Sequence, residues 1–269
     1  MYKRQIQERI KSSKRIVIKV GTSTLTYENG NLNLGLLNKL AWVLSDLRNQ
    51  GRDVILVTSG AIGVGSKKLN FITRPKETRE KQAAAAVGQA ELMHIYQNFF
   101  GEYSQRVAQI LLTKDDFKEG EKKANTTNTL ETLLNFGVIP IVNANDTIST
   151  FEIEFSDNDR LSASVASLIG ADLLVILTDI DALYDSNPKT HPDAKRISYV
   201  EKVTDDIMKM GGEKGSEFSV GGMETKLLAA RECYDGRVIM GILDGSEPLL
   251  IEKLISGEDV GTIFDCMED

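Results

Sequence analysis

The sequence predicts an α/β fold built on a doubly wound, mostly parallel β-sheet. Short runs of apolar and β-branched residues recur along the 269-residue chain, and most gaps between them are long enough for a helix. The runs are continuous rather than alternating, which is typical of strands buried on both faces. Within the gaps, apolar residues lie three or four positions apart, as in amphipathic helices. Alternating strands and helices imply right-handed βαβ crossovers.

Each predicted strand is one of these apolar runs. The first contains Ile16, Val17 and Ile18, and it ends at Gly21, where a residue without a Cβ favours a turn. The later runs have the same character. In chain order, the predicted strands are residues 16–20, 54–58, 107–112, 138–142, 173–178 and 238–242.

The predicted helices lie between these strands or directly before the last one. Gly51 and Gly137 stand where two of them should stop. In chain order, the predicted helices are residues 36–50, 81–100, 126–135, 159–169 and 224–234. No Pro/Gly/Ser-rich linker and no repeat interrupts the pattern, so we expect residues 1–269 to form a single domain.

Composition excludes several classes of protein. The net charge of −7, from 32 Lys and Arg against 39 Asp and Glu, argues against a general nucleic-acid surface. Two cysteines are too few for a disulfide framework, which favours the reducing cytoplasm. No apolar run is long enough to span a membrane, and residues 1–13 are too charged for a signal peptide. We therefore expect a cytoplasmic protein without nucleic-acid or membrane partners.

Polar residues lie at the ends of four of the predicted strands or directly after them. Ligands of doubly wound sheets bind outside the carboxyl ends of the strands, so these residues are expected to form one site. In chain order they are Lys19, Gly21, Thr22 and Ser23, then Ser59 and Gly60, then Asn143, Asn145 and Asp146, and finally Thr178, Asp179 and Asp181.

Two lysines give this site its chemistry. Lys19 ends a buried strand, and a buried ammonium needs an anion, although an edge-strand lysine in solvent is the alternative. Lys226 lies one turn inside a predicted helix that follows Gly221 and Gly222, where backbone N–H groups can hold phosphate. Taken alone, that segment is equally well a helix cap with a solvated lysine. Together the lysines favour phosphoryl transfer, which needs charge neutralisation and alignment.

Other nucleotide and metal sites fit less well. The glycines of Gly60-x-x-Gly63-x-Gly65 are in the wrong order for a dinucleotide site, so a nicotinamide oxidoreductase is the weakest alternative. P-loop and protein-kinase signatures are absent from the sequence, and residues 157–159 lack the rest of a calcium loop. The two histidines lack zinc-ligand spacing. A carboxylate with a pKa of about 4.3 needs no general base, so the shortage of histidine suits a kinase acting on a carboxylate.

Several motifs in one order resemble the amino acid kinase family and, within it, the glutamate 5-kinases. The resemblance runs from about Lys14 to Phe264. It implies an αβα sandwich with a mostly parallel central sheet. It also implies ATP-dependent phosphorylation of the γ-carboxylate of L-glutamate, the first step of proline biosynthesis. The motifs are Val17-Ile18-Lys19-Val20-Gly21-Thr22-Ser23, Val57-Thr58-Ser59-Gly60-Ala61-Ile62, Lys81-Gln82-x-x-x-Ala86-Val87-Gly88-Gln89, Asn143-x-Asn145-Asp146, Asp157-Asn158-Asp159-x-Leu161-Ser162-Ala163, Leu177-Thr178-Asp179 and Gly221-Gly222-Met223-x-Thr225-Lys226.

The resemblance also implies a role for individual residues. Lys19 and Lys226 would bind the ATP phosphates, and Asp159 would orient both lysines. Asp146 would suit the ammonium of glutamate and Asn158 a carboxylate. The full substrate-binding set would be Ser59, Gly60, Asn143, Asp146 and Asn158. The nucleotide-binding set would be Lys19, Thr178, Asp179, Val220, Gly221, Gly222, Met223, Glu224, Thr225 and Lys226. Mg²⁺ would be held mainly by ATP phosphates and water, without dedicated protein ligands.

Regulation and assembly are expected from the resemblance alone. It implies proline as a feedback inhibitor and a homodimer or homotetramer. Ser219 and Val220 replace the Gly-Thr of many members, which alters the nucleotide loop. The chain ends soon after Phe264, so we expect the catalytic domain without a C-terminal domain of the RNA-modifying (PUA) type.

Two alternatives stay open. The first is another small-acid kinase of the same fold, acting on acetylglutamate, aspartate or carbamate. Asp146 argues against an acetylated substrate, since a free ammonium is what needs a carboxylate partner. The second is a non-catalytic amino-acid sensor, which would have no need of both Lys19 and Lys226.

Overall fold

The computed structural model describes residues 2–73, 75–149, 158–188, 190–211 and 222–266 of the chain. They belong to two compact units. Unit 2 is the continuous stretch of residues 20–158, and unit 1 combines residues 1–19 with residues 159–269. The chain passes from one unit to the other between Lys19 and Val20 and again between Asn158 and Asp159. Both crossing points fall at predicted site residues.

Three parallel strands form the sheet of unit 2. They are β2 (Asp53–Thr58), β3 (Arg106–Leu112) and β4 (Val138–Ala144), in the spatial order β3-β4-β2. β4 pairs in parallel with β3 from Arg106↔Val138 to Leu112↔Ala144, and with β2 at Leu56↔Ile141. Residues 54–58 of β2 and residues 139–144 of β4 are buried, whereas the edge strand β3 is buried only at Leu112. The three carboxyl ends therefore point the same way.

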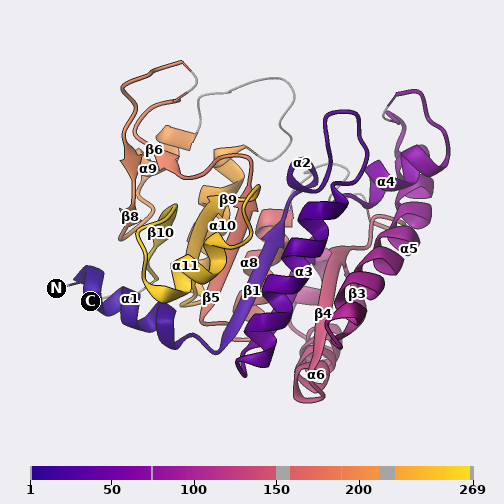
Figure 1. Ribbon diagram of the computed structural model, residues 1–269, viewed down its shortest axis with the longest axis horizontal. Coiled ribbons are helices and arrows are strands. Elements are labelled where there is room, and N and C mark those ends of the chain that lie inside the picture. Colours follow the sequence, from indigo (N-terminus) through magenta and orange to yellow (C-terminus); the bar gives the residue numbers. More distant parts are fainter. Residues whose placement is uncertain (1, 74, 150–157, 189, 212–221, 267–269) are drawn as a thin grey trace. The chain divides into compact units, whose positions relative to one another are not determined.

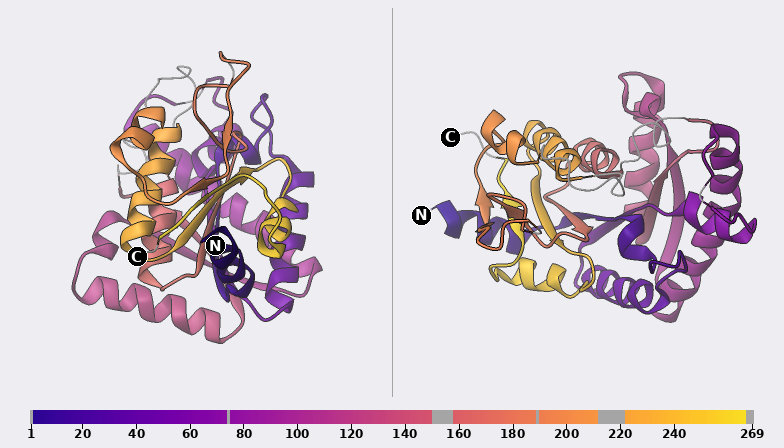
Figure 2. Two further views of the ribbon diagram at one scale, coloured as in Figure 1. Left: turned by 90° about the vertical axis from the view of Figure 1, so that its left-hand side faces the viewer. Right: turned by 90° about the horizontal axis from the view of Figure 1, so that it is seen from above.

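Helices cover both faces of these three strands. Figure 2, in the view from above, shows α3 and α5 on one face and α6 on the other. Short helical elements follow two of these strands, α4 after β2 and η1 after β3. The helical elements of unit 2 are α2 (Thr22–Leu25), α3 (Leu34–Asn49), α4 (Ala61–Lys68), α5 (Thr78–Glu102), η1 (Lys114–Phe117) and α6 (Glu121–Asn135).

Five strands of unit 1 lie side by side within the described residues. In spatial order they are β1 (Arg15–Val20), whose last residue belongs to unit 2, β5 (Leu173–Thr178), β9 (Ile239–Asp244), β10 (Thr262–Phe264) and β8 (Tyr199–Val200). β5 and β9 are parallel, and β10 runs antiparallel to β9. Every residue of β5 is buried, as expected for a strand covered on both faces. β6 (Leu183–Tyr184) and β7 (Arg196–Ile197) form a separate antiparallel pair.

The helices of unit 1 also lie on both faces of its strands. In the same view, α8 and α10 lie on one face and α11 on the other (Figure 2). α1 contacts α11, and Ile6 and Ile10 of α1 are buried one helical turn apart. The helices are α1 (Tyr2–Ser12), α8 (Asn158–Leu168), α9 (Asp205–Gly211), α10 (Met223–Asp235) and α11 (Leu250–Ser256) (Figure 1).

The predicted fold class is confirmed. All six predicted strands and all five predicted helices occur, each with bounds within a few residues of those expected. α3 and α6 end at Asn49 and Asn135, each two residues before the glycine at which we expected it to stop. The prediction of a single domain over 1–269 stays a prediction. No described helix combines the length and apolar character needed to cross a membrane.

Two glycines let α4 and α5 of unit 2 come into backbone contact. A Cβ on Gly65 would lie 1.7 Å from the carbonyl oxygen of Ala84, and one on Gly88 would lie 1.8 Å from that of Ala61. Real Cβ atoms do not approach backbone that closely, so only glycine fits at either position. This contact fixes the part of α5 that carries Gln89 against the helix that follows β2.

Candidate active site

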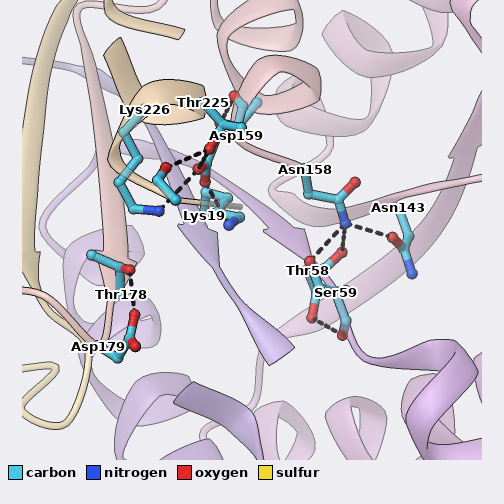
Figure 3. Close-up of polar contacts among 12 residues, drawn as sticks. Lys19, Thr58, Ser59, Asn143, Asn158, Asp159, Thr178, Asp179, Thr225 and Lys226 are labelled. Atoms are coloured by element: carbon cyan, nitrogen blue, oxygen red, sulfur yellow. Dashed lines mark hydrogen bonds and ion pairs between the residues drawn. The ribbon is translucent and has the colours of Figure 1, made fainter. Parts of the chain in front are cut away.

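A cluster of two lysines and one aspartate lies in unit 1. Lys19 is the penultimate residue of β1, Asp159 is the second residue of α8, and Lys226 is in the first turn of α10. The Lys19 Nζ lies 2.5 Å from Asp159 Oδ1, and the Lys226 Nζ lies 3.1 Å from Asp159 Oδ2 (Figure 3). The structure therefore places Asp159 between the two lysines.

The cluster is almost fully removed from solvent. Lys19 is 6% exposed, Lys226 is 3% exposed and Asp159 is 0% exposed. Burial by itself would raise the pKa of the Asp159 carboxyl, but the ammonium groups of Lys19 and Lys226 together hold that pKa below its ordinary value. The aspartate is therefore ionised at neutral pH. Two ammonium groups and one carboxylate leave a net charge of +1, which suits an anionic ligand.

The start of α10 adds polar groups to this cluster. Thr225 Oγ1 lies 3.0 Å from Asp159 Oδ2 and 2.8 Å from the carbonyl oxygen of Gly222, and its one hydrogen can serve either acceptor. Gly222 precedes the helix without a side-chain cap, and the Thr225 N–H donates to its carbonyl oxygen at 3.2 Å, so the N–H groups of Met223 and Glu224 are the first-turn donors best placed for a ligand. Met223 and Glu224 complete this turn. Val220 and Gly221, also predicted to bind nucleotide, lie outside the described residues.

Thr178 and Asp179 follow the end of β5. Thr178 is buried and Asp179 is exposed, and Thr178 Oγ1 donates a hydrogen bond of 3.1 Å to Asp179 Oδ1 (Figure 3). The backbone N–H of Gly245, which follows β9, donates to the carbonyl oxygen of Thr178 at 2.7 Å. Because β5 and β9 are parallel, these loops both leave the sheet of unit 1 at the carboxyl ends of its strands. Doubly wound folds bind nucleotides at that end of the sheet.

The predicted substrate residues lie in unit 2. Ser59 and Gly60 follow β2, and Gly60 has φ 101°, which lets the chain turn directly into α4. Asn143 lies near the end of β4, Asp146 lies just beyond it, and Asn158 begins α8. Asn143, Asp146 and Asn158 are each at most 3% exposed.

A network of amide hydrogen bonds joins three of these residues. The Nδ2 of Asn158 donates to the carbonyl oxygen of Thr58 at 2.7 Å, to Ser59 Oγ at 2.9 Å and to Asn143 Oδ1 at 2.9 Å (Figure 3). Two hydrogens serve three acceptors, so at least one hydrogen is shared. Ser59, Asn143 and Asn158 therefore form one hydrogen-bonded unit at the end of β2, in which the two asparagines are buried and Ser59 is partly exposed.

Sequence reasoning assigned no role to three further residues around this network. Gln89 of α5 is 7% exposed, and its Oε1 accepts from Asn143 Nδ2 at 2.9 Å. The Tyr96 hydroxyl lies 2.7 Å from Thr58 Oγ1, and burial raises the pKa of Tyr96 above its ordinary value. Gln89 stood within a quoted motif, but a glutamine on a helix carries no signature of its own. Thr58 and Tyr96 are 38 positions apart, and only the fold brings them together.

Comparison with known proteins identifies relatives along nearly the whole chain. Residues 14–242 match the model of the amino acid kinase family. A glutamate 5-kinase of Listeria innocua is 53% identical over 263 residues, which cover 96% of this chain and 95% of the relative. A glutamate 5-kinase of Clostridium perfringens is 51% identical, covering 96% and 98%.

Solved structures show the same fold at much lower identity. A UMP kinase from Bacillus anthracis superposes with a TM-score of 0.64 at 17% identity, covering 95% of this chain and 97% of that one. A T. acidophilum isopentenyl phosphate kinase superposes with a TM-score of 0.62 at 16% identity, covering 93% and 99%. These two likenesses support the fold alone.

Proposed function

This chain belongs to the amino acid kinase family, among its glutamate 5-kinases, and we propose that the residues described above transfer the γ-phosphoryl group of ATP to the γ-carboxylate of L-glutamate. The product would be L-glutamyl 5-phosphate, the first intermediate of proline biosynthesis. The observation that supports this most strongly is the buried cluster of Lys19, Asp159 and Lys226, with its net charge of +1.

The two lysines would supply the charge that the transfer requires. The γ-phosphoryl group carries negative charge on three oxygens, and that charge shifts toward the leaving oxygen of ADP as the bond breaks. Lys19 and Lys226 would stabilise this charge from buried positions, where electrostatic interactions are stronger than in water. Asp159 would keep both ammonium groups in place before ATP arrives. Preorganisation of this kind avoids reorganising the site during the reaction.

The acceptor needs no general base. The γ-carboxylate of glutamate is ionised at neutral pH, so one of its oxygens can attack phosphorus while the bond to ADP breaks. Both histidines of the chain, His94 and His191, are exposed, and His94 contacts Asn98 on its own helix. Within the described part of the chain, neither histidine forms a hydrogen bond with a proposed site residue.

Mg²⁺ would accompany ATP. Among the described residues, no three histidine, cysteine, aspartate or glutamate side chains gather into a group that could hold a metal ion. Mg²⁺ prefers oxygen ligands and retains several waters, so phosphate oxygens and water would supply its coordination. When bound, it would neutralise phosphate charge alongside the two lysines.

Hydroxylamine trapping tests the proposed reaction and its substrate together. The protein is incubated with MgATP, hydroxylamine and either L-glutamate, N-acetylglutamate or aspartate. An acyl phosphate reacts to give a hydroxamate, and we expect it from L-glutamate alone. Hydroxamate from one of the other acids would show that L-glutamate is the wrong substrate. If no acid gives hydroxamate while ATP still binds, an amino-acid sensor would be favoured.

Asp146→Asn is expected to raise the KM for glutamate by about tenfold or more while kcat changes little. The change removes the negative charge that would pair with the α-ammonium of the substrate, and a charge-assisted hydrogen bond contributes more than a neutral one. Initial rates over a range of glutamate concentrations measure both constants. An unchanged KM would show that Asp146 does not bind the ammonium.

The kcat of this enzyme is expected to vary little between about pH 6 and about pH 9. The lowered pKa of Asp159 means that its charge is lost only as the pH falls below about 4, and the acceptor carboxylate is protonated in the same acidic range. A pH profile of kcat at saturating substrates tests this. A limb with an apparent pKa near 7 would reveal a general base that this mechanism lacks.

Regulation and assembly stay predictions. Proline as a feedback inhibitor and a homodimer or homotetramer are what the family resemblance implies, and a cytoplasmic location is what the cysteine content predicts. The aliphatic, ammonium-bearing proline would compete for the residues proposed here to hold glutamate.

A further inference from the structure

Three amide side chains of unit 2 form a directed relay. Gln89 Oε1 accepts from Asn143 Nδ2, and Asn143 Oδ1 accepts from Asn158 Nδ2, each at 2.9 Å. All three side chains are buried, and they come from α5, the end of β4 and the start of α8. The residues are far apart in sequence, so the relay exists only in the folded chain.

Two backbone groups fix the direction of the relay. The N–H of Ala144 can only donate, and it donates to Asn143 Oδ1 at 2.9 Å. The carbonyl of Thr58 can only accept, and it accepts from Asn158 Nδ2 at 2.7 Å. Reversing either asparagine would place like groups against each other, so the oxygen and nitrogen positions follow from the backbone. The NH₂ group of Asn143 must then face Gln89, and Gln89 must accept the hydrogen bond through its Oε1.

The relay leaves one buried acceptor with no hydrogen-bond partner at the end next to Ser59. Asn158 Oδ1 has no partner within the described part of the chain, and Asn158 is 99% buried, being 1% exposed. Its oxygen points away from Thr58, Ser59 and Asn143 (Figure 3). Leaving a buried acceptor without a donor is costly, so such a group is commonly kept for a ligand. At the other end, Gln89 Nε2 has no partner among the described residues either.

We propose that Gln89 is a positioning residue that, through Asn143, holds Asn158 with its oxygen toward the substrate, so that Asn158 accepts a hydrogen bond from the α-ammonium of glutamate. This rests on the proposed function for the identity of the substrate. It also replaces the expectation that Asn158 binds a carboxylate. The NH₂ group that a carboxylate would need is already bonded to three protein acceptors.

The relay would therefore contribute to selection for an α-amino acid. An ammonium can donate to Asn158 Oδ1, whereas glutarate, which has the same two carboxylates but no amine, cannot. A substrate that lacks the donor leaves the buried oxygen unpaired, and sites built on such bonds discriminate strongly. Without Gln89, the Asn143 amide loses the acceptor that restrains it, and Asn158 in turn loses a fixed partner.

The dissociation constants of L-glutamate and glutarate test this proposal. We would measure them by calorimetry with an unreactive ATP analogue present, for the wild-type protein, Gln89→Met and Gln89→Glu. Methionine keeps the length of the side chain but removes the acceptor, so Gln89→Met should weaken glutamate binding about tenfold and lower the preference for glutamate over glutarate by a similar factor. Glutamate at this position can still accept from Asn143 in either protonation state, so Gln89→Glu should stay within about threefold of the wild type.

The outcomes separate positioning from a merely structural role. Loss of folded protein in Gln89→Met would lower the number of binding sites without changing the preference between ligands. An unchanged preference in Gln89→Met, or equal impairment in Gln89→Glu, would overturn the relay. The binding constants do not depend on turnover. Failure of the hydroxamate assay with normal results here would therefore reject the proposed reaction and leave the relay standing.

Discussion

Replacing Lys226 with methionine is expected to lower kcat by a factor on the order of 10² or more. Methionine has a similar length and fits a buried position, so the change removes the charge with little loss of packing. Lys19 still pairs with Asp159 in this variant, and the net charge of the cluster falls from +1 to 0. The loss should fall mainly on kcat, because the developing charge on the phosphoryl group is greatest in the transition state. Steady-state kinetics with both substrates measure it.

Lys253→Met is the matched control for this experiment. Lys253 is an exposed lysine on α11, and it lies in unit 1 like Lys226. Its replacement should leave kcat within about twofold, because exposed charges contribute little at a distance. Thermal unfolding of both variants would verify that they are folded. Near-normal turnover of Lys226→Met in folded protein would remove Lys226 from the mechanism.

Replacing Gly88 with alanine is expected to destabilise the protein by about 3 kcal/mol or more. The added Cβ would lie 1.8 Å from the carbonyl oxygen of Ala61 and 2.5 Å from the backbone nitrogen of Gly65, so α4 and α5 would have to separate. Backbone cannot move aside as a flexible side chain can. Since Gln89 follows directly, the same displacement should also weaken glutamate binding in whatever protein still folds. Chemical denaturation measures the free energy of unfolding.

Gly101→Ala provides the comparison within the same helix. A Cβ on Gly101 would meet no heavy atom within 4 Å, so alanine adds helix propensity without a clash. This variant should be as stable as the wild type or more stable by about 0.5–1 kcal/mol. Equal stability of Gly88→Ala and Gly101→Ala would show that the two helices can separate freely, contrary to the close contact described.

The sequence predicted the elements that are long and strongly patterned. The strands at 16–20 and 173–178 consist mostly of apolar residues, and every residue in both ranges is buried. α1 was missed because, among its side chains whose burial is described, Ile6 and Ile10 alone mark a buried face between charged residues. β8 and β10 have two and three residues, which is too short for any periodicity to appear. Their existence depends on pairing with neighbours that local sequence does not specify.

The site was predictable where a residue type is costly unless it has a function. Lys19 in a buried strand is such a case, and the structure places an aspartate against it. The orientation of the Asn158 amide was not predictable, because an asparagine offers both a donor and an acceptor. The carbonyl of Thr58 and the N–H of Ala144, brought together by the fold, decide that the Asn158 oxygen is the group left for a ligand. The hydrogen bond between Asn143 and Gln89 was not predictable for the same reason.

The fate of the carboxylate oxygens tests the central claim most directly. L-Glutamate labelled with ¹⁸O at both γ-carboxylate oxygens is incubated with MgATP and hydroxylamine, and the released phosphate is analysed by mass spectrometry. Attack of a carboxylate oxygen on phosphorus places one label in the acyl phosphate bridge. Hydroxylamine then attacks the acyl carbon and breaks its bond to that oxygen, so we predict phosphate with one ¹⁸O. Unlabelled phosphate would mean that water accepts the phosphoryl group, and the carboxylate-kinase mechanism would be wrong.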